Sequence, residues 1–246
     1  MSLLARSAAI LLCLMDAALA AEPVRRIAIM VEPYYAAARD AAAVPRVAVG
    51  KQYDHLASTR REDIIAVRDK IQASPKLVTP MTLMVLAVRL YDVGLRDDAV
   101  FWFYAAKDRY IVMSEVLDVR HPSLVQVEDA VKNFVTLAGP VINGYAFCDL
   151  AKQKDLHAKA VAWVETNPYD VMFMAQMPAL PGDRNENHRR AIANANDRAA
   201  KERAYFDDAK TVETYYATRK RNEADVKYCW KQRGLLMRED GLRGLC

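Results

Sequence analysis

The chain has 246 residues, of which 53% are hydrophobic and 27% are charged. This balance is typical of a globular protein, excludes an intrinsically disordered chain and leaves ample apolar material for a core. The formal net charge of +4 is small and evenly spread, so it gives no reason to expect nucleic acid as a partner.

Residues 1–20 have the pattern of a cleavable signal peptide. Arg6 precedes the apolar run Ala8–Met15, and Ala18 with Ala20 forms the small-residue site that signal peptidase accepts. The run is much shorter than the ~20 apolar residues that span a bilayer, and no later run is long enough, so we predict no stable membrane insertion. The sequence therefore predicts a mature chain that is soluble in the periplasm, or secreted.

The mature chain divides into an arm and a domain. Residues 21–57 contain Pro23, Pro33 and Pro45 and show no sustained period, which predicts an extended or irregular arm. From residue 58 onward helical periodicity dominates, and strand patterns are absent or short. We expect residues 58–246 to form a single all-α domain, an irregular helical bundle.

Start and stop signals divide this domain into helices. Thr79-Pro80 is an N-cap followed by a proline at the first helical position, and Gly94 ends the helix that begins there. The next helix follows after a short turn, so the two must lie antiparallel. The expected helices run from Ser58 or Thr59 to Ser74, from Pro80 to Gly94, from Asp98 towards Met113, from His121 to Gly139-Pro140, and from Tyr145 through Val164 to Asn167.

The C-terminal part of the chain has the composition of a long helix. Residues 185–233 contain neither proline nor glycine and are rich in Ala, Glu, Lys and Arg. Their apolar residues form a narrow stripe. We expect one long helix, bent or broken at most once, that lies across the other helices with its charged side in water.

Residues 80–113 resemble a helix pair of the tetratricopeptide repeat. The pattern that carries the resemblance is Leu83-x-x-Leu86-Ala87-x-x-Leu90-x-x-x-Gly94-x-x-x-x-Ala99-x-x-x-Phe103-x-x-Ala106. Trp102-Phe103 followed by Ala105-Ala106 is also similar to the related Sel1-like repeat. The chain departs from the family at Ile111, where a proline is expected, and no second copy follows at this period. A single unit cannot bury its own faces, so the flanking helices must cover it.

The resemblance implies a binding face, because the first helix of such repeats lines a groove for peptide ligands. By position this face holds Met84, Val88, Tyr91 and Asp92. The alternative is that the long C-terminal helix simply covers these side chains. This alternative is favoured, because no stacked repeats are present to build a groove.

The cysteines permit one disulfide bond in the mature chain. Cleavage after Ala20 leaves Cys148, Cys229 and Cys246, so one thiol stays free or pairs between chains. In an oxidising compartment a bond is expected. The three pairings stay open, although Cys148 with Cys229 would tie the middle of the chain to the terminal helix.

No residue pattern predicts catalysis or a cofactor. The chain lacks a nucleophile motif and a glycine-rich phosphate loop. It also lacks a C-x-x-C pair, so we expect no metal and no other cofactor. Adjacent acids such as Asp97-Asp98 point about 100° apart on a helix and do not face one substrate together. The four histidines fit surface or capping positions, and His157, in a lysine-rich stretch, is expected to be solvated.

Aromatic residues give the remaining candidates for contact with a partner. Residues 101–104 cover every side of one helix turn, which predicts burial. Tyr215 and Tyr216 on the charged terminal helix are better candidates for exposed contact. We therefore predict an exported, non-enzymatic protein that binds another protein, as an immunity-type or envelope accessory protein. The alternative is an envelope enzyme acting on glycan or peptide, with a carboxylate site that only the fold assembles.

Overall fold

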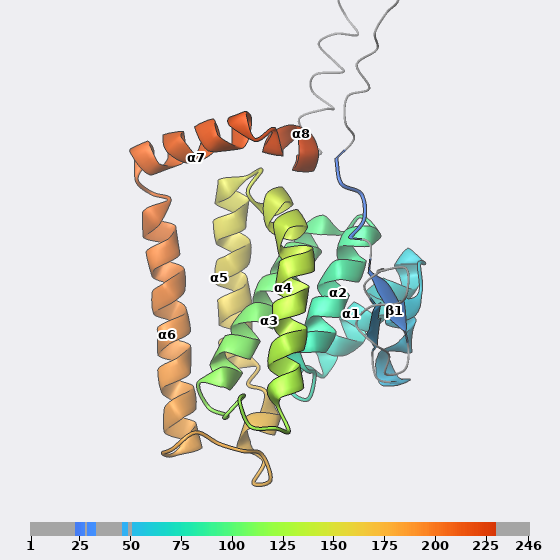
Figure 1. Ribbon diagram of the computed structural model, residues 1–246, viewed down its shortest axis with the longest axis vertical. Helices are drawn as coiled ribbons and strands as arrows, with labels where there is room; N and C mark the ends of the chain where they lie inside the picture. Colours follow the sequence, from blue (N-terminus) through green and yellow to red (C-terminus); the bar gives the residue numbers. More distant parts are fainter. Residues whose placement is uncertain (1–22, 28, 33–45, 49–50, 230–246) are drawn as a thin grey trace, which may run out of the picture.

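The computed structural model describes residues 23–27, 29–32, 46–48 and 51–229. The expected signal peptide and Cys246 lie outside the described residues. Helices dominate the described chain, so the all-α prediction is confirmed, with one very small sheet added (Figure 1). In chain order the elements are β1 (Met30–Glu32), β2 (Arg46–Ala48), η1 (Lys51–Ala57), α1 (Arg61–Ala73), α2 (Pro80–Asp92), α3 (Arg96–Ser114), α4 (Val125–Ala146), α5 (Leu150–Thr166), η2 (Asp170–Phe173), α6 (Arg184–Tyr205), α7 (Ala209–Arg221) and α8 (Ala224–Tyr228).

The α2–α3 hairpin forms the centre of the molecule. The Thr79 side chain accepts a hydrogen bond from the backbone N–H of Thr82 at 3.0 Å and thereby caps α2. Gly94 has φ of +84°, a conformation that glycine adopts without strain. The backbone N–H of Leu95 then closes the turn by donating to the Leu90 carbonyl at 2.8 Å. The start of α2 and the turn that ends it are as the sequence predicts, whereas α3 begins at Arg96, two residues before the predicted Asp98.

Helix α3 is buried on nearly all sides. It packs against α2, α4, α5 and α6. Of the four residues predicted to be buried, Trp102, Phe103 and Tyr104 are each at most 3% exposed, and Phe101 is partly buried against the core. The remaining helices are therefore arranged around α2 and α3 (Figure 1).

Helix α4 is longer than the sequence predicts. We expected a helix to end near Gly139-Pro140 and another to begin at Tyr145, but α4 continues through Pro140 to Ala146. Proline inside a helix removes one hydrogen bond and costs ~3 kcal/mol. Burial of Ala138 and Ile142, both 0% exposed, on either side of the proline favours the uninterrupted helix.

The prediction of one long helix over residues 185–233 is wrong. The chain breaks twice, into α6, α7 and α8, and α7 turns across the ends of α4 and α5 instead of continuing α6 (Figure 1). At the first break Lys154 donates to the carbonyl of Phe206, and Asp208 accepts from the N–H of Thr211 as the N-cap of α7. At the second break Glu223 adopts a left-handed conformation with φ of +52°. Polar capping thus accompanies the first break, and neither break contains a proline or a glycine.

The described part of the N-terminal arm is extended and packed on the bundle. β1 and β2 pair in parallel, with Met30 opposite Arg46. Ile27 is 4% exposed, and the backbone N–H of Val24 donates to the Lys227 carbonyl at 2.9 Å. The start of the arm at Val24 therefore lies against α8, whereas the strands and η1 lie beside α1 and α2 (Figure 1).

Among the described helices, none has a stretch that is both long enough and apolar enough to cross a membrane.

Candidate functional site

A cavity of about 450 Å³ lies where the ends of the central helices meet the C-terminal helices. Its walls come from the start of α3, the end of α4, the start of α5, α7 and the residue after α8. Apolar side chains such as Leu150 and Leu156 form part of the wall. The polar part of the lining comprises Asp97, Tyr145, Cys148, Asp149, Lys152, Tyr216 and Cys229.

A disulfide bond between Cys148 and Cys229 forms part of this wall. Of the three pairings that the sequence left open, the structure has this one, with the two Cα atoms 5.5 Å apart. Cys148 lies two residues after the end of α4 and is partly exposed, whereas Cys229 directly follows α8 and is 3% exposed. The bond therefore fastens α8 to the end of α4.

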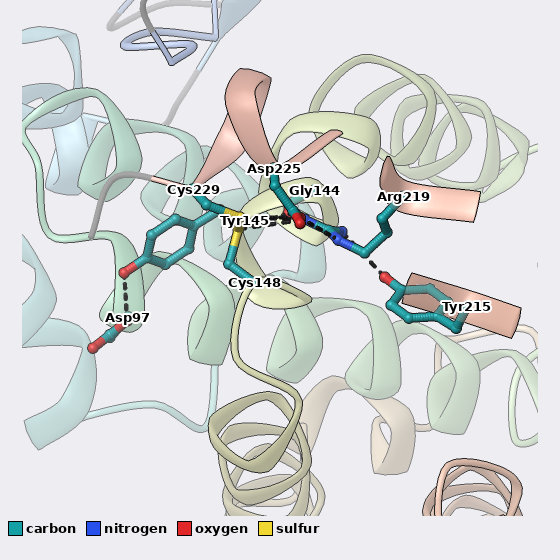
Figure 2. The surroundings of a disulfide bond; sticks show 8 residues. All are labelled: Asp97, Gly144, Tyr145, Cys148, Tyr215, Arg219, Asp225 and Cys229. Carbon is teal, nitrogen blue, oxygen red and sulfur yellow. Dashed lines mark hydrogen bonds and ion pairs between the residues drawn. A yellow bond between two sulfur atoms is a disulfide. The ribbon is translucent and has the colours of Figure 1, made fainter. Parts of the chain in front are cut away.

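Arg219, in the last turn of α7, is the centre of the hydrogen-bond network around this bond (Figure 2). Its Nε donates to Asp225 Oδ1 at 2.7 Å, and its Nη1 donates to the Tyr215 hydroxyl at 3.1 Å. Its Nη2 donates to the Gly144 carbonyl at 3.1 Å and lies 3.4 Å from each Sγ of the disulfide. Burial alone would lower the pKa of Arg219, but the bonds to Asp225 and Tyr215 outweigh it and raise the pKa, so the guanidinium stays charged.

Gly144 allows α4 and α8 to approach closely. A Cβ atom at this position would lie 2.6 Å from the ring of Tyr228. Any larger residue would therefore push Tyr228, and α8 with it, away from α4. Gly144 lies inside α4, so its role is close packing within a helix.

The cavity lining also includes a carboxylate, Asp97, that two other side chains of the lining bind. The Tyr145 hydroxyl donates to Asp97 Oδ1 at 2.8 Å, and Lys152 Nζ lies 3.0 Å from Asp97 Oδ2. Burial and the neighbouring carboxylate raise the pKa of Tyr145 above its usual value. The other acid in the lining, Asp149, accepts from the Lys152 backbone N–H at 3.0 Å and caps α5. Both carboxylates thus have structural roles.

An aromatic cluster holds the middle of α7 against Phe147, which follows α4, and against Phe206, which precedes α7. The rings of Phe147, Phe206 and Tyr215 form a closed triangle with centroid distances of 5.4–5.5 Å. Tyr205 and Tyr216 flank this triangle and are 63% and 40% exposed. Of the two tyrosines that the sequence singled out, Tyr215 is therefore half-buried in the cluster, and Tyr216 is exposed beside the cavity.

The four candidate residues on α2 lie inside the protein. Met84, Val88 and Tyr91 are at most 1% exposed. The Asp92 side chain is 7% exposed, bound by Arg89 at 2.9 Å and by the backbone N–H of Ile27 at 2.8 Å. The elements packed on α2 are α1, α3, α4 and η1, whereas α6 packs on α3 and α5. The cover that we expected from the C-terminal helix is supplied by other elements.

Cys148, Asp225 and Cys229 also bring three potential metal-ligand atoms within 4.8 Å of one another. Thiolates, not disulfide sulfurs, bind metal ions. The Arg219 guanidinium, moreover, contacts all three residues, so a cation already occupies the charged centre of the group. These residues do not fit a metal.

His157 belongs to a buried polar cluster, so the prediction that it is solvated is wrong. It is 6% exposed, with Nε2 3.4 Å from Asp108 Oδ2 and Nδ1 3.3 Å from Glu202 Oε2. Burial alone would lower the pKa of His157, but the bonds to the two carboxylates raise it to about 9. The bond from His157 lowers the pKa of Glu202 to about 2. The cluster ties α6 to α5 and α3.

The fold and the site define an all-helical protein whose C-terminal helices are fastened by a disulfide bond and a buried arginine. No family model matches the chain, and no solved structure matches it. The chain is similar to an uncharacterized protein of Haemophilus influenzae, with 32% identity over 212 residues, which cover 85% of this chain and 81% of that protein. The chain belongs to the family of that protein.

Proposed function

We propose that the chain is exported to an oxidising compartment, where it binds another protein through α7 and the adjoining end of α6. The disulfide bond supports this localisation, because such bonds persist in the periplasm and outside the cell. The signal-peptide pattern of residues 1–20 supports it independently.

The observation that carries the binding proposal is a pair of exposed tyrosines on a rigidly held corner. Tyr205 and Tyr216 are 63% and 40% exposed, and Arg219 is the buried residue of α7. Tyrosine is enriched in protein interfaces because it combines apolar area with a hydroxyl group. The aromatic triangle holds the middle of α7 and the Arg219 network holds its last turn, which lowers the ordering cost of binding.

The charge of α7 indicates the chemistry of the partner. Lys210, Lys220 and Arg221 are exposed along or at the end of the helix. A partner with an acidic rim around an apolar depression would complement this surface. An immunity-type or envelope accessory role is the specific form of the proposal. In this form of the proposal, the tetratricopeptide-like helix pair α2–α3 is the core that supports the binding surface on α7.

The alternative of a glycan- or peptide-acting enzyme has less support. Such an enzyme needs two carboxylates that face one substrate. Asp97 and Asp149 do line one cavity, but the first binds Tyr145 and Lys152, and the second caps a helix.

Quantitative capture from the envelope fraction tests the proposal. The bait is the tagged mature chain, compared with Tyr205→Ser/Tyr216→Ser and with the control Leu77→Ser, which removes a 61%-exposed side chain from another surface. We expect one partner to be recovered equally by the wild-type and control baits, and about tenfold less by the tyrosine variant, since interface tyrosines often contribute more than 1 kcal/mol each. Equal recovery by all three baits would contradict the proposed surface.

A further inference from the structure

The Cys148–Cys229 bond differs from a buried structural disulfide in its surroundings. Both cysteines belong to the lining of the cavity of about 450 Å³, and the pair is asymmetric. Cys148 is partly exposed, whereas Cys229 is 3% exposed. A thiol that enters the cavity therefore reaches Cys148, the more exposed of the two residues, more easily than Cys229.

A guanidinium group lies against both sulfur atoms. Arg219 Nη2 is 3.4 Å from Cys148 Sγ and 3.4 Å from Cys229 Sγ (Figure 2). A neutral disulfide sulfur accepts only a weak hydrogen bond from this N–H, whereas a thiolate accepts a charge-assisted one. Arg219 therefore stabilises the reduced form more than the oxidised form. Cys148 also directly precedes Asp149, the N-cap of α5, where the helix dipole favours negative charge.

We propose that Cys148–Cys229 is a thiol-exchange site that accepts electrons from a dithiol, with Cys148 as the attacked sulfur and Cys229 as the leaving group. The inference does not rest on the proposed binding function. It assigns a chemical reactivity to the cavity, and the class of reactant is a small dithiol or a dithiol on an extended segment of another protein.

The exchange balances in two steps. One thiolate of the dithiol attacks Cys148 Sγ, a mixed disulfide forms, and the electron pair of the broken S–S bond goes to Cys229 Sγ as a thiolate held by Arg219. The second thiol of the reactant loses its proton to solvent and attacks the mixed disulfide at the reactant's own sulfur. Cys148 leaves as a thiolate. The reactant becomes a disulfide, and the protein gains two electrons and, after protonation, two thiols.

Reduction kinetics with dithiothreitol test the proposal on the oxidised mature chain, in a Cys246→Ser background that leaves this one cysteine pair. Arg219→Gln removes the charge beside the sulfurs, and Arg221→Gln, at an exposed position in the same turn, is the matched control. We expect Arg219→Gln to slow reduction about three- to tenfold and to raise the midpoint ratio of reduced to oxidised reagent by about tenfold, because a leaving thiol of higher pKa leaves more slowly. Arg221→Gln should match the unchanged chain.

The direction of the change in reduction rate distinguishes an electrostatic role of Arg219 from a role in packing. If Arg219 only holds α7 in place, its loss loosens the site, and the bond is reduced faster. A faster or unchanged rate in Arg219→Gln would therefore overturn the proposal. Asp225→Asn gives a second test, since Oδ1 of Asp225 lies 3.5 Å from Cys229 Sγ and opposes a thiolate there. We expect this variant to be reduced faster than the unchanged chain, and a slower rate would contradict the model.

The position of the mixed disulfide gives an independent test. Reaction with glutathione, acid quenching and peptide mapping by mass spectrometry should place the adduct on Cys148. An adduct on Cys229 would overturn the assignment, as would a reduction rate that does not depend on thiol concentration and equals the rate of global unfolding.

Discussion

At the residue scale, the cluster of His157, Asp108 and Glu202 makes the stability of the fold depend on pH. The pKa of His157 is raised from 6.5 to about 9 in the folded chain, so the folded state binds a proton that the unfolded state releases over this range. The stabilising contribution is complete below about pH 6.5 and is lost as the pH rises to about 9. The lowered pKa of Glu202 acts in the opposite direction, and its contribution is lost as the pH falls from 4.5 towards about 2.

The free energy of unfolding should therefore fall by roughly 1–3 kcal/mol between about pH 6.5 and about pH 9. Urea unfolding followed by circular dichroism measures this change. His157→Gln keeps a hydrogen-bonding side chain but does not titrate, so its decrease over the same interval should be much smaller. An identical decrease in both proteins would show that His157 is not the group responsible.

Gly144 gives a second prediction at the residue scale. Gly144→Ala places a Cβ atom 2.6 Å from the Tyr228 ring, so we expect a net loss of roughly 1–3 kcal/mol from the displacement of α8. Gly139→Ala, in the same helix, meets Phe103 at an ordinary contact distance of 3.5 Å. That control should be neutral, or stabilising by up to ~1 kcal/mol through helix propensity.

Thermal unfolding of the two alanine variants measures the difference. If Gly144→Ala proved as stable as Gly139→Ala, the close approach of α4 and α8 would be contradicted.

Some of the site residues could be predicted from the sequence, but Arg219, which makes most of the hydrogen bonds around the disulfide, could not. Cys148 and Cys229 were a recognisable pair because cysteines are few. Arg219 was not recognisable, because its partner Gly144 lies 75 residues away and an arginine near a helix end is ordinary. His157 was misread for the same reason, since its carboxylate partners come from two other helices. A local sequence pattern carries no information on contacts between segments that are distant in the sequence.

At the element scale, α7 and α8 depend on the disulfide bond for their position. Apart from their mutual packing, α8 packs on α4, and few core side chains come from either helix. The bond spans a sequence separation of 81 residues, so its loss should increase the entropy of the unfolded chain substantially.

Cys148→Ser/Cys229→Ser should lower the free energy of unfolding by about 4 kcal/mol and expose α7 and α8 to proteolysis before the bundle unfolds. Urea unfolding and limited trypsin digestion, with cleavage sites assigned by mass spectrometry, measure the two effects. The matched control is Cys246→Ser, which leaves this bond intact. First cleavage in the bundle rather than in α7 would contradict the role given to the bond.

The ends of helices could be predicted from the sequence only where residues within one turn of the end determine it. Thr79-Pro80 and Gly94 set the ends of α2 as predicted, because capping geometry and a positive φ act within one turn. Pro140 was read as a stop, but packing on both sides of it offsets the cost. The break after α6 was missed because Asp208 and Lys154 act as caps, and the second of these comes from α5.

At the scale of the whole molecule, both described ends of the chain meet beside the cavity. The backbone N–H of Val24 donates to Lys227 in α8, and the Val24 carbonyl accepts from the Tyr91 hydroxyl at 3.1 Å. The segment that follows the expected cleavage site is thus part of the packing between α2 and α8. The fold class could be predicted from helical periodicity and composition. The packing of the segment around Val24 between α2 and α8 could not be predicted, because it joins residues far apart in the sequence.

The central claim is that the chain is exported, processed and closed by the Cys148–Cys229 bond. Peptide mapping by mass spectrometry without reduction, on protein purified from the envelope fraction of its own cells after alkylation of free thiols, tests all three parts at once. We expect an N-terminal peptide that begins at Ala21 and a linked pair of peptides that carry Cys148 and Cys229. Recovery of the chain with residues 1–20 still attached and both cysteines alkylated would contradict the account.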